Sequence, residues 1–162
     1  MRKVLLSIFV LCVLLPQATH AQPQADKILI LKSKRHLMLI SNGQALKAYR
    51  ISLGKNPVGP KTRRGDNKTP EGTYIIDRRK ENSQFFRALH VSYPNSNDLA
   101  RARQIGADPG GDIMIHGLPN GRTSSWNKRF TDWTAGCIAV TNQEIREIWH
   151  SVADGTVVEI RP

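Results

Sequence analysis

Short apolar or alternating segments, each closed by turn-forming residues, run through most of this chain and limit it to a β-rich fold. The segments 36–40 and 44–53 flank Asn42-Gly43, a pair that favours a two-residue hairpin turn because both positions tolerate positive φ. Residues 54–71 are rich in proline, glycine and charge and are predicted to form a long loop. Further strands are predicted at 27–32, 73–78, 85–91, 112–116, 137–140 and 156–160.

Two short helices are predicted among these strands. Thr141 and Glu144 have the spacing of a capping box, and Ile145, Ile148 and Trp149 follow at the spacing of one helical face. Another helix is predicted over residues 97–104, with Asn97 as N-cap and Gly106 just past its end. There is no repeat, low-complexity segment or internal linker, so we expect one compact β-rich domain.

The first residues have the pattern of a secretory signal peptide. A positive start, Met1-Arg2-Lys3, precedes an apolar run over residues 4–15, which is shorter than the roughly 20 residues that a membrane span needs. Small residues at Thr19 and Ala21 predict cleavage between Ala21 and Gln22. The pattern therefore predicts a signal peptide at 1–21 and a mature domain at 22–162 that is secreted, with the periplasm as the expected compartment.

The predicted mature domain holds a single cysteine, Cys137. In an oxidising compartment an unpaired cysteine is a dimer link, a reactive thiol or an inert buried thiol. A zinc site is excluded because a stable one needs three or four ligands and no second cysteine is available. No metal or other cofactor is expected.

The surroundings of Cys137 favour the reactive thiol. The residues 134–136, a short turn of small side chains, lead to Cys137 at the start of a predicted strand. A nucleophilic cysteine needs a base, and His116, at the end of another predicted strand, is the best candidate. His36 and His150 are interpreted as surface or packing residues. His90 is left open between a structural role in its strand and a place at the rim of the site.

The arrangement of these residues resembles the signature of the L,D-transpeptidase catalytic domain, the YkuD-type domain. In that family a His-Gly pair is followed, after a loop, by Ser or Thr, a variable residue, Gly and Cys; here these are His116-Gly117 and residues 134–137. The turn at 69–74 (TPEGTY), the hairpin at 36–53 and the segments 92–95 and 111–116 are also similar to the family's short, single-domain periplasmic branch. The resemblance spans about residues 27–160 and implies a mainly β domain, a sandwich or barrel with one or two short helices.

The resemblance also implies a mechanism. His116, oriented by the backbone carbonyl of Gly117, would take the proton of Cys137, and the thiol would attack the amide that joins an L-centre to D-Ala in a peptidoglycan stem peptide. The backbone N–H groups of Gly136 and Cys137 are the expected oxyanion donors. An amine from a second stem would resolve the thioester. Thr134 is expected either to hold the turn or to contact substrate, and Tyr93 to line the cleft.

Two departures from the family pattern leave alternatives open. Ala135 stands where His is common, and Ala139 stands where an Arg often follows, so hydrolysis by water, as a carboxypeptidase or peptidase, is an alternative to transfer. Cleavage of a protein attached to the wall belongs to the same alternative. A third interpretation, from another class, is a non-catalytic cationic module that binds the cell wall.

The charge balance bears on the expected partners. The formal net charge is +11, and Lys61, Arg63, Arg64 and Lys68 crowd the loop before the TPEG turn. Such charge either attracts the carboxylates of stem peptides, with Arg63 and Arg64 as substrate-binding residues, or is a solvated surface. Stem peptides and a wall-linked lipoprotein are the expected partners. Nucleic acid is not expected, because basic residues are not interleaved with aromatic ones, and a monomer is expected.

Overall fold

The structure is a computed structural model that describes residues 24–123, 125–126 and 131–162. The predicted signal peptide at 1–21 lies outside the described residues. No helix in the described part of the chain is both long and apolar enough to cross a membrane.

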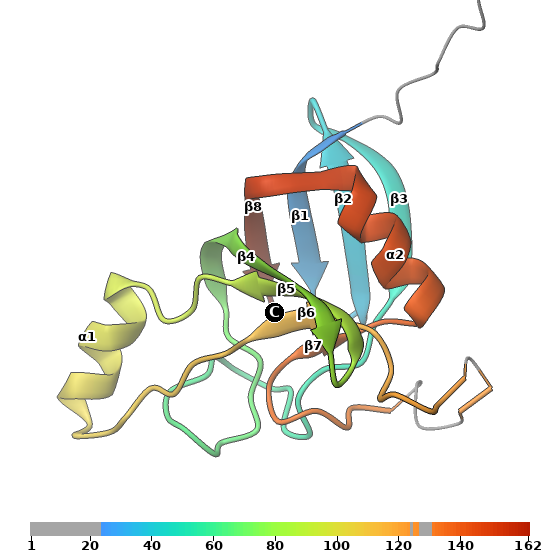
Figure 1. Cartoon of the computed structure of the whole chain (residues 1–162). Helices are drawn as coiled ribbons and strands as arrows, with labels where there is room; N and C mark the ends of the chain where they lie inside the picture. The colour runs from blue at the N-terminus through green and yellow to red at the C-terminus, as the bar shows by residue number, and fades with distance from the viewer. Residues whose placement is uncertain (1–23, 124, 127–130) are drawn as a thin grey trace, which may run out of the picture.

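The described residues form one curled sheet of 8 strands with two helices (Figure 1). The strand order is β3-β2-β1-β8-β4-β5-β6-β7. The helices are α1 (Ser96–Gln104) and α2 (Asn142–Ser151). The strands are β1 (Ala25–Leu31), β2 (His36–Ser41), β3 (Gln44–Arg50), β4 (Gly72–Ser83), β5 (Phe86–Val91), β6 (Met114–His116), β7 (Ile138–Ala139) and β8 (Val152–Arg161).

The long strand β4 joins the two parts of the sheet. Its first residues, Gly72–Ile75, pair with β8, and the remainder, from Ile76 to Ser83, pairs with β5. Register shifts interrupt the second ladder, and such irregularities bend a strand and increase its twist. The sheet therefore curls, and the short strands β6 and β7 follow β5 at its far edge (Figure 1).

The apolar core lies between the inner face of this sheet and α2. Ile145 and Ile148 of α2 are fully buried and belong to the same cluster as Ile28, Leu89 and Val158 from three strands. The helix crosses the sheet, whereas α1 stands apart from it (Figure 1). Burial of apolar surface stabilises a fold by about 25 cal/mol per Å². The packing of Ile145 and Ile148 against the sheet therefore fixes the position of α2 and of the turn that enters it.

The mainly β class and the two helices are confirmed. In the hairpin, Asn42 and Gly43 have φ of 50° and 77°, as the predicted turn requires. Helix α2 begins after Thr141, whose side chain accepts from Glu144 N while the Glu144 carboxylate accepts from Thr141 N.

Several predicted boundaries are wrong for local reasons. The N-cap of α1 is Asn95, not Asn97, because Asn95 and Asp98 form a capping box. The strand predicted at 112–116 begins only at Met114, since Asp112 has a left-handed φ of 54°. The last strand begins at Val152, and Gly155 lies within it with φ 86° rather than before it. Strand β4 continues to Ser83, beyond the predicted end at 78.

Candidate active site

His116 and Cys137 lie on neighbouring strands at the far edge of the sheet. Strands β6 and β7 are parallel, with Ile115 opposite Ile138 and His116 opposite Ala139. Continuing this register places Cys137, just before β7, opposite Met114. Because side chains alternate along a strand, Met114 and His116 share a face, and Cys137 lies on that same face. Segments 21 residues apart in the chain thus bring the imidazole and the thiol to one side of the sheet.

The two side chains line one pocket of about 160 Å³. Its other lining residues come mainly from β4, β5 and the turn between them, and from the approach to β6: Lys80, Ser83, Gln84, Phe85, Ala88, Asp112 and Met114. A larger hollow of about 570 Å³ lies between β3 and α2, but its lining contains neither histidine nor cysteine. The smaller pocket is therefore the candidate active site, because it contains both His116 and Cys137.

The His116 ring is buried and its orientation is fixed. His116 is 3% exposed, and its ring packs between Phe85 and Trp133, at centroid distances of 4.4 and 5.7 Å. Nδ1 lies 2.7 Å from the carbonyl oxygen of Gly117. A carbonyl only accepts, so Nδ1 carries the hydrogen and Nε2 has the free lone pair. Burial lowers the pKa of His116 to about 4, although the Gly117 carbonyl partly offsets this effect.

Gly117 must be a glycine for this arrangement to form. A Cβ at this position would lie 2.5 Å from Asn142 Oδ1 and 3.0 Å from the Phe85 carbonyl oxygen. The same Asn142 oxygen accepts a hydrogen bond from Leu118 N at 2.8 Å. The first residue of α2 thus holds the turn that carries the carbonyl bonded to His116.

The Cys137 thiol is partly exposed and has backbone neighbours. Sγ donates to the carbonyl oxygen of Asp112 at 3.5 Å. Burial raises the pKa of the Cys137 thiol, and a hydrogen bond from the Met114 backbone opposes that rise only in part. With a lowered pKa on His116 and a raised one on Cys137, the resting pair is a neutral imidazole and a neutral thiol.

Thr134 holds the turn that presents Cys137. Its side chain is buried; Oγ1 donates to the carbonyl oxygen of Cys137 at 2.7 Å and accepts from Gly136 N at 3.0 Å. The Gly136 N–H, one of the two expected oxyanion donors, is therefore bonded to Thr134 within the turn. Gly136 has φ 138°, and a Cβ there would lie 2.7 Å from the carbonyl oxygen of Lys68, so only glycine fits.

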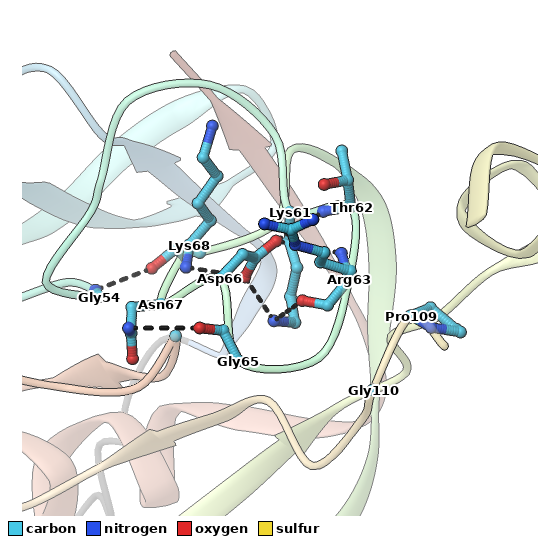
Figure 2. A network of polar contacts seen from close by, with 12 residues as sticks. Gly54, Lys61, Thr62, Arg63, Gly65, Asp66, Asn67, Lys68, Pro109 and Gly110 are labelled. Carbon is cyan, nitrogen blue, oxygen red and sulfur yellow. Dashed lines mark hydrogen bonds and ion pairs between the residues drawn. The ribbon is translucent and has the colours of Figure 1, made fainter. Parts of the chain in front are cut away.

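The Lys68 carbonyl belongs to a loop, residues 61–68, that we call the support loop. Asp66 is its centre (Figure 2): it pairs with the Lys61 ammonium at 2.7 Å and accepts from the backbone N–H groups of Thr62, Arg63 and Lys68. Burial alone would raise the pKa of Asp66, but the hydrogen bonds from Lys61 and the backbone outweigh it and lower the pKa to about 2. The Lys61 and Asp66 side chains are only 4% and 7% exposed.

The structure does not bring the other predicted substrate-binding residues to the pocket. Tyr93 is 3% exposed and packs in the core, where its hydroxyl donates to the Pro109 carbonyl oxygen, so it does not line the cleft. Arg63 and Arg64 are on the exposed side of the support loop and are not among the pocket residues. Arg64 instead pairs with Asp108 at 2.7 Å.

Sequence reasoning missed several residues that shape the site. Phe85 and Trp133 enclose His116, Asp112 accepts from the thiol, and Lys80 lines the pocket as an exposed cation. The position of Trp133 directly before Thr134 was the one available signal. The two residues that depart from the family pattern differ in exposure: Ala135 is exposed and Ala139 is buried. Ala139 on β7 lies opposite His116 on β6. Within the described residues no group of three potential ligands could hold a metal ion.

The family model of the L,D-transpeptidase catalytic domain (YkuD) matches residues 25–160. The Escherichia coli K12 protein named "Putative L,D-transpeptidase YafK" is 34% identical over 116 residues, which cover 70% of this chain and 40% of that protein. The chain thus spans less than half the length of this relative.

Solved structures show the same fold. The helical cell shape determining protein Pgp2 from Campylobacter jejuni is 25% identical with a TM-score of 0.60, over 83% of this chain and 46% of that one. Bd1075 from Bdellovibrio bacteriovorus is 25% identical with a TM-score of 0.57, over 83% and 47%. An L,D-transpeptidase from Xylanimonas cellulosilytica, at 18% identity and a TM-score of 0.56 over 86% and 62%, shares the fold.

Proposed function

Because the chain belongs to the L,D-transpeptidase catalytic domain family, we propose that it is a cysteine acyltransferase that acts on peptidoglycan stem peptides. The observation that supports this most strongly is the pairing of two groups in one pocket. A neutral imidazole, with Nδ1–H bonded to the Gly117 carbonyl oxygen and Nε2 left as a base, shares that pocket with a partly exposed thiol.

The proposed acylation begins from the neutral pair. His116 Nε2 takes the proton from Cys137 as Sγ attacks the carbonyl carbon of the amide between an L-centre and D-Ala. Transfer of the proton during the attack suits a thiol with a raised pKa and an imidazole with a lowered one, since a preformed ion pair is disfavoured. The Cys137 N–H is the remaining predicted donor for the oxyanion.

Collapse of the tetrahedral intermediate gives the acyl-enzyme. The C–N bond breaks, the imidazolium returns its proton to the leaving amine, and D-Ala departs, which leaves a thioester on Cys137. An amine of a second stem then attacks the thioester carbonyl while His116 accepts the amine proton. The C–S bond breaks, the thiol recovers its proton, and an amide cross-link remains.

Hydrolysis is the second candidate. Ala139, which stands where the family often has an Arg, is buried, so this position offers no cation to a substrate carboxylate. The exposed Lys80 is the cation that lines the pocket. With water in place of the acceptor amine, the same steps release a free carboxylate. We place either reaction outside the cytoplasm because residues 1–21 have the pattern of a signal peptide.

Digestion of purified muropeptides, read by mass spectrometry, tests the proposal. The wild type is expected to form cross-linked products, or to release D-Ala if water is the acceptor. Cys137→Ala should form neither, and circular dichroism should show that it keeps its fold. Unchanged muropeptides with the wild type, or products with Cys137→Ala, would contradict the proposal.

Acylation by a carbapenem is an independent test. The proposed nucleophile should form one covalent adduct, which peptide mapping should assign to Cys137 rather than to Cys12. An adduct that persists in Cys137→Ala would exclude Cys137 as the nucleophile.

A further inference from the structure

The residue whose carbonyl accepts from the Cys137 thiol is itself held by charged neighbours. Asp112 has a left-handed φ of 54°, which is uncommon for a residue other than glycine. Its carboxylate lies 3.4 Å from Arg78 Nη2 and 3.8 Å from His90 Nε2. Its backbone oxygen accepts from Cys137 Sγ at 3.5 Å. Asp112 therefore connects the thiol to a cluster of ionisable groups on β4 and β5.

His90 is in contact with two carboxylates. Its Nδ1 lies 2.5 Å from Asp77 Oδ1, and its Nε2 faces Asp112 at 3.8 Å. Its register partners are Arg78 on β4 and Met114 on β6, and its side chain is 12% exposed. With a carboxylate facing each ring nitrogen, the doubly protonated ring attracts both, whereas a neutral ring presents a lone pair to one of them. Asp112 is thus held more firmly when His90 is charged.

We propose that His90 is a positioning residue: through Asp112 it fixes the backbone carbonyl that accepts the Cys137 thiol hydrogen and competes with His116 for it. The inference rests on the proposed role of Cys137 as the nucleophile. A thiol that donates to Asp112 does not donate to His116, so this arrangement keeps the sulfur protonated and at rest. Removal of the His90 ring, and with it the contact to the Asp112 carboxylate, weakens the hold on Asp112 and leaves the thiol hydrogen to His116.

The experiment measures the thiol directly. The full chain is alkylated with iodoacetamide from pH 5.5 to 8.5, and the rate is read on the Cys137 peptide by mass spectrometry. We expect His90→Gln to react about twofold to tenfold faster than the wild type, the factor that one net hydrogen bond provides.

Two further variants separate positioning from a general change of structure. Asp112→Asn removes the carboxylate, and asparagine tolerates a left-handed backbone. It should match His90→Gln, and the double variant should be no faster than either single one. The matched control, His36→Gln on β2, removes an exposed histidine outside the pocket and should follow the wild type. Superimposable rates for wild type and His90→Gln, or additive effects in the double variant, would overturn the inference.

The alkylation readout is independent of turnover. If alkylation responds to His90 but muropeptides are not processed, the inference stands and the proposed function fails. If muropeptides are processed and the alkylation profiles coincide, the proposed function stands and the inference fails.

Discussion

The two segments that adjoin Cys137 and the turn before it are held in opposite ways. The support loop, residues 61–68, depends on an ion pair whose side chains are 4% and 7% exposed. Residues 108–113 depend on Asp108 and Asp112, whose side chains are 59% and 81% exposed in their ion pairs. Breaking a buried pair by removing one partner costs about 3–5 kcal/mol, whereas exposed pairs contribute about 0–1 kcal/mol. One side of Cys137 is therefore tied to the stability of the fold, and the other is held only by exposed ion pairs.

The sharpest test of this contrast removes one charge from each segment. Asp66→Asn should lower the free energy of unfolding by about 3–5 kcal/mol, because it leaves the buried Lys61 ammonium without its counterion. Asp108→Asn, the matched control, should cause a much smaller loss, because the Asp108 carboxylate and its partner Arg64 are exposed. Urea unfolding followed by circular dichroism measures both. Equal losses would show that the two segments are held alike.

The pH dependence of stability distinguishes the contribution of His116 from that of the support loop. The pKa of His116 is about 4 in the fold and 6.5 when unfolded, so below pH 6.5 the unfolded chain binds a proton that the native protein does not. Stability should therefore fall by about 3 kcal/mol as the pH drops from 6.5 to 4. Asp66, with its pKa lowered from 3.8 to about 2, adds a further loss only below pH 4. Unfolding of His116→Gln measured over the same range should lack the first loss and keep the second; a wild-type-like decline would argue against a buried neutral imidazole.

Gly136→Ala tests how closely the support loop fits the turn that precedes Cys137. The added Cβ would lie 2.7 Å from the Lys68 carbonyl oxygen, and alanine is unfavourable at the positive φ of this position. We therefore expect the free energy of unfolding to fall by about 1–3 kcal/mol. Gly65→Ala is the control, because its φ is also positive but its Cβ meets nothing within 4 Å. Thermal unfolding should show the larger decrease for Gly136→Ala. If Gly65→Ala costs as much, contact with the support loop is not what makes glycine necessary at 136.

The smallest effect is expected at Arg64. Its guanidinium pairs with Asp108 on an exposed surface outside the pocket, so Arg64→Ala should leave the free energy of unfolding almost unchanged. Muropeptide turnover should keep its KM within about twofold. A large rise in KM would instead support the predicted role of Arg64 in substrate binding.

Local patterns in the sequence predicted those parts of the fold that local interactions determine. The Asn42-Gly43 turn and the capping box at Thr141 are set by backbone preferences and short-range hydrogen bonds. The left-handed Asp112, which shortens β6, is not visible locally because its conformation depends on contacts from other strands. Likewise, no local signal indicated that β4 pairs with two different strands.

At the site, residue types were more predictable than their contacts. The His-Gly pair and the Thr-x-Gly-Cys turn are readable as motifs, and the structure places His116 and Cys137 in one pocket. The bond from Gly136 N to Thr134 Oγ1 and the packing of Phe85 and Trp133 on His116 depend on side-chain positions that spacing alone does not specify. A tyrosine is common both in clefts and in cores, so the residue type of Tyr93 did not distinguish the two. Its burial in the structure shows that it belongs to the core.

The central claim is that Cys137 is a nucleophile whose proton is taken by His116. The most direct measurement is the mass of the acid-quenched protein after incubation with a stem tetrapeptide and no acceptor amine. The account predicts an adduct equal to the donor without its terminal D-Ala, mapped to Cys137 and absent from Cys137→Ala and His116→Gln. No adduct on the wild type, or an adduct of the same mass on Cys137→Ala, would contradict it.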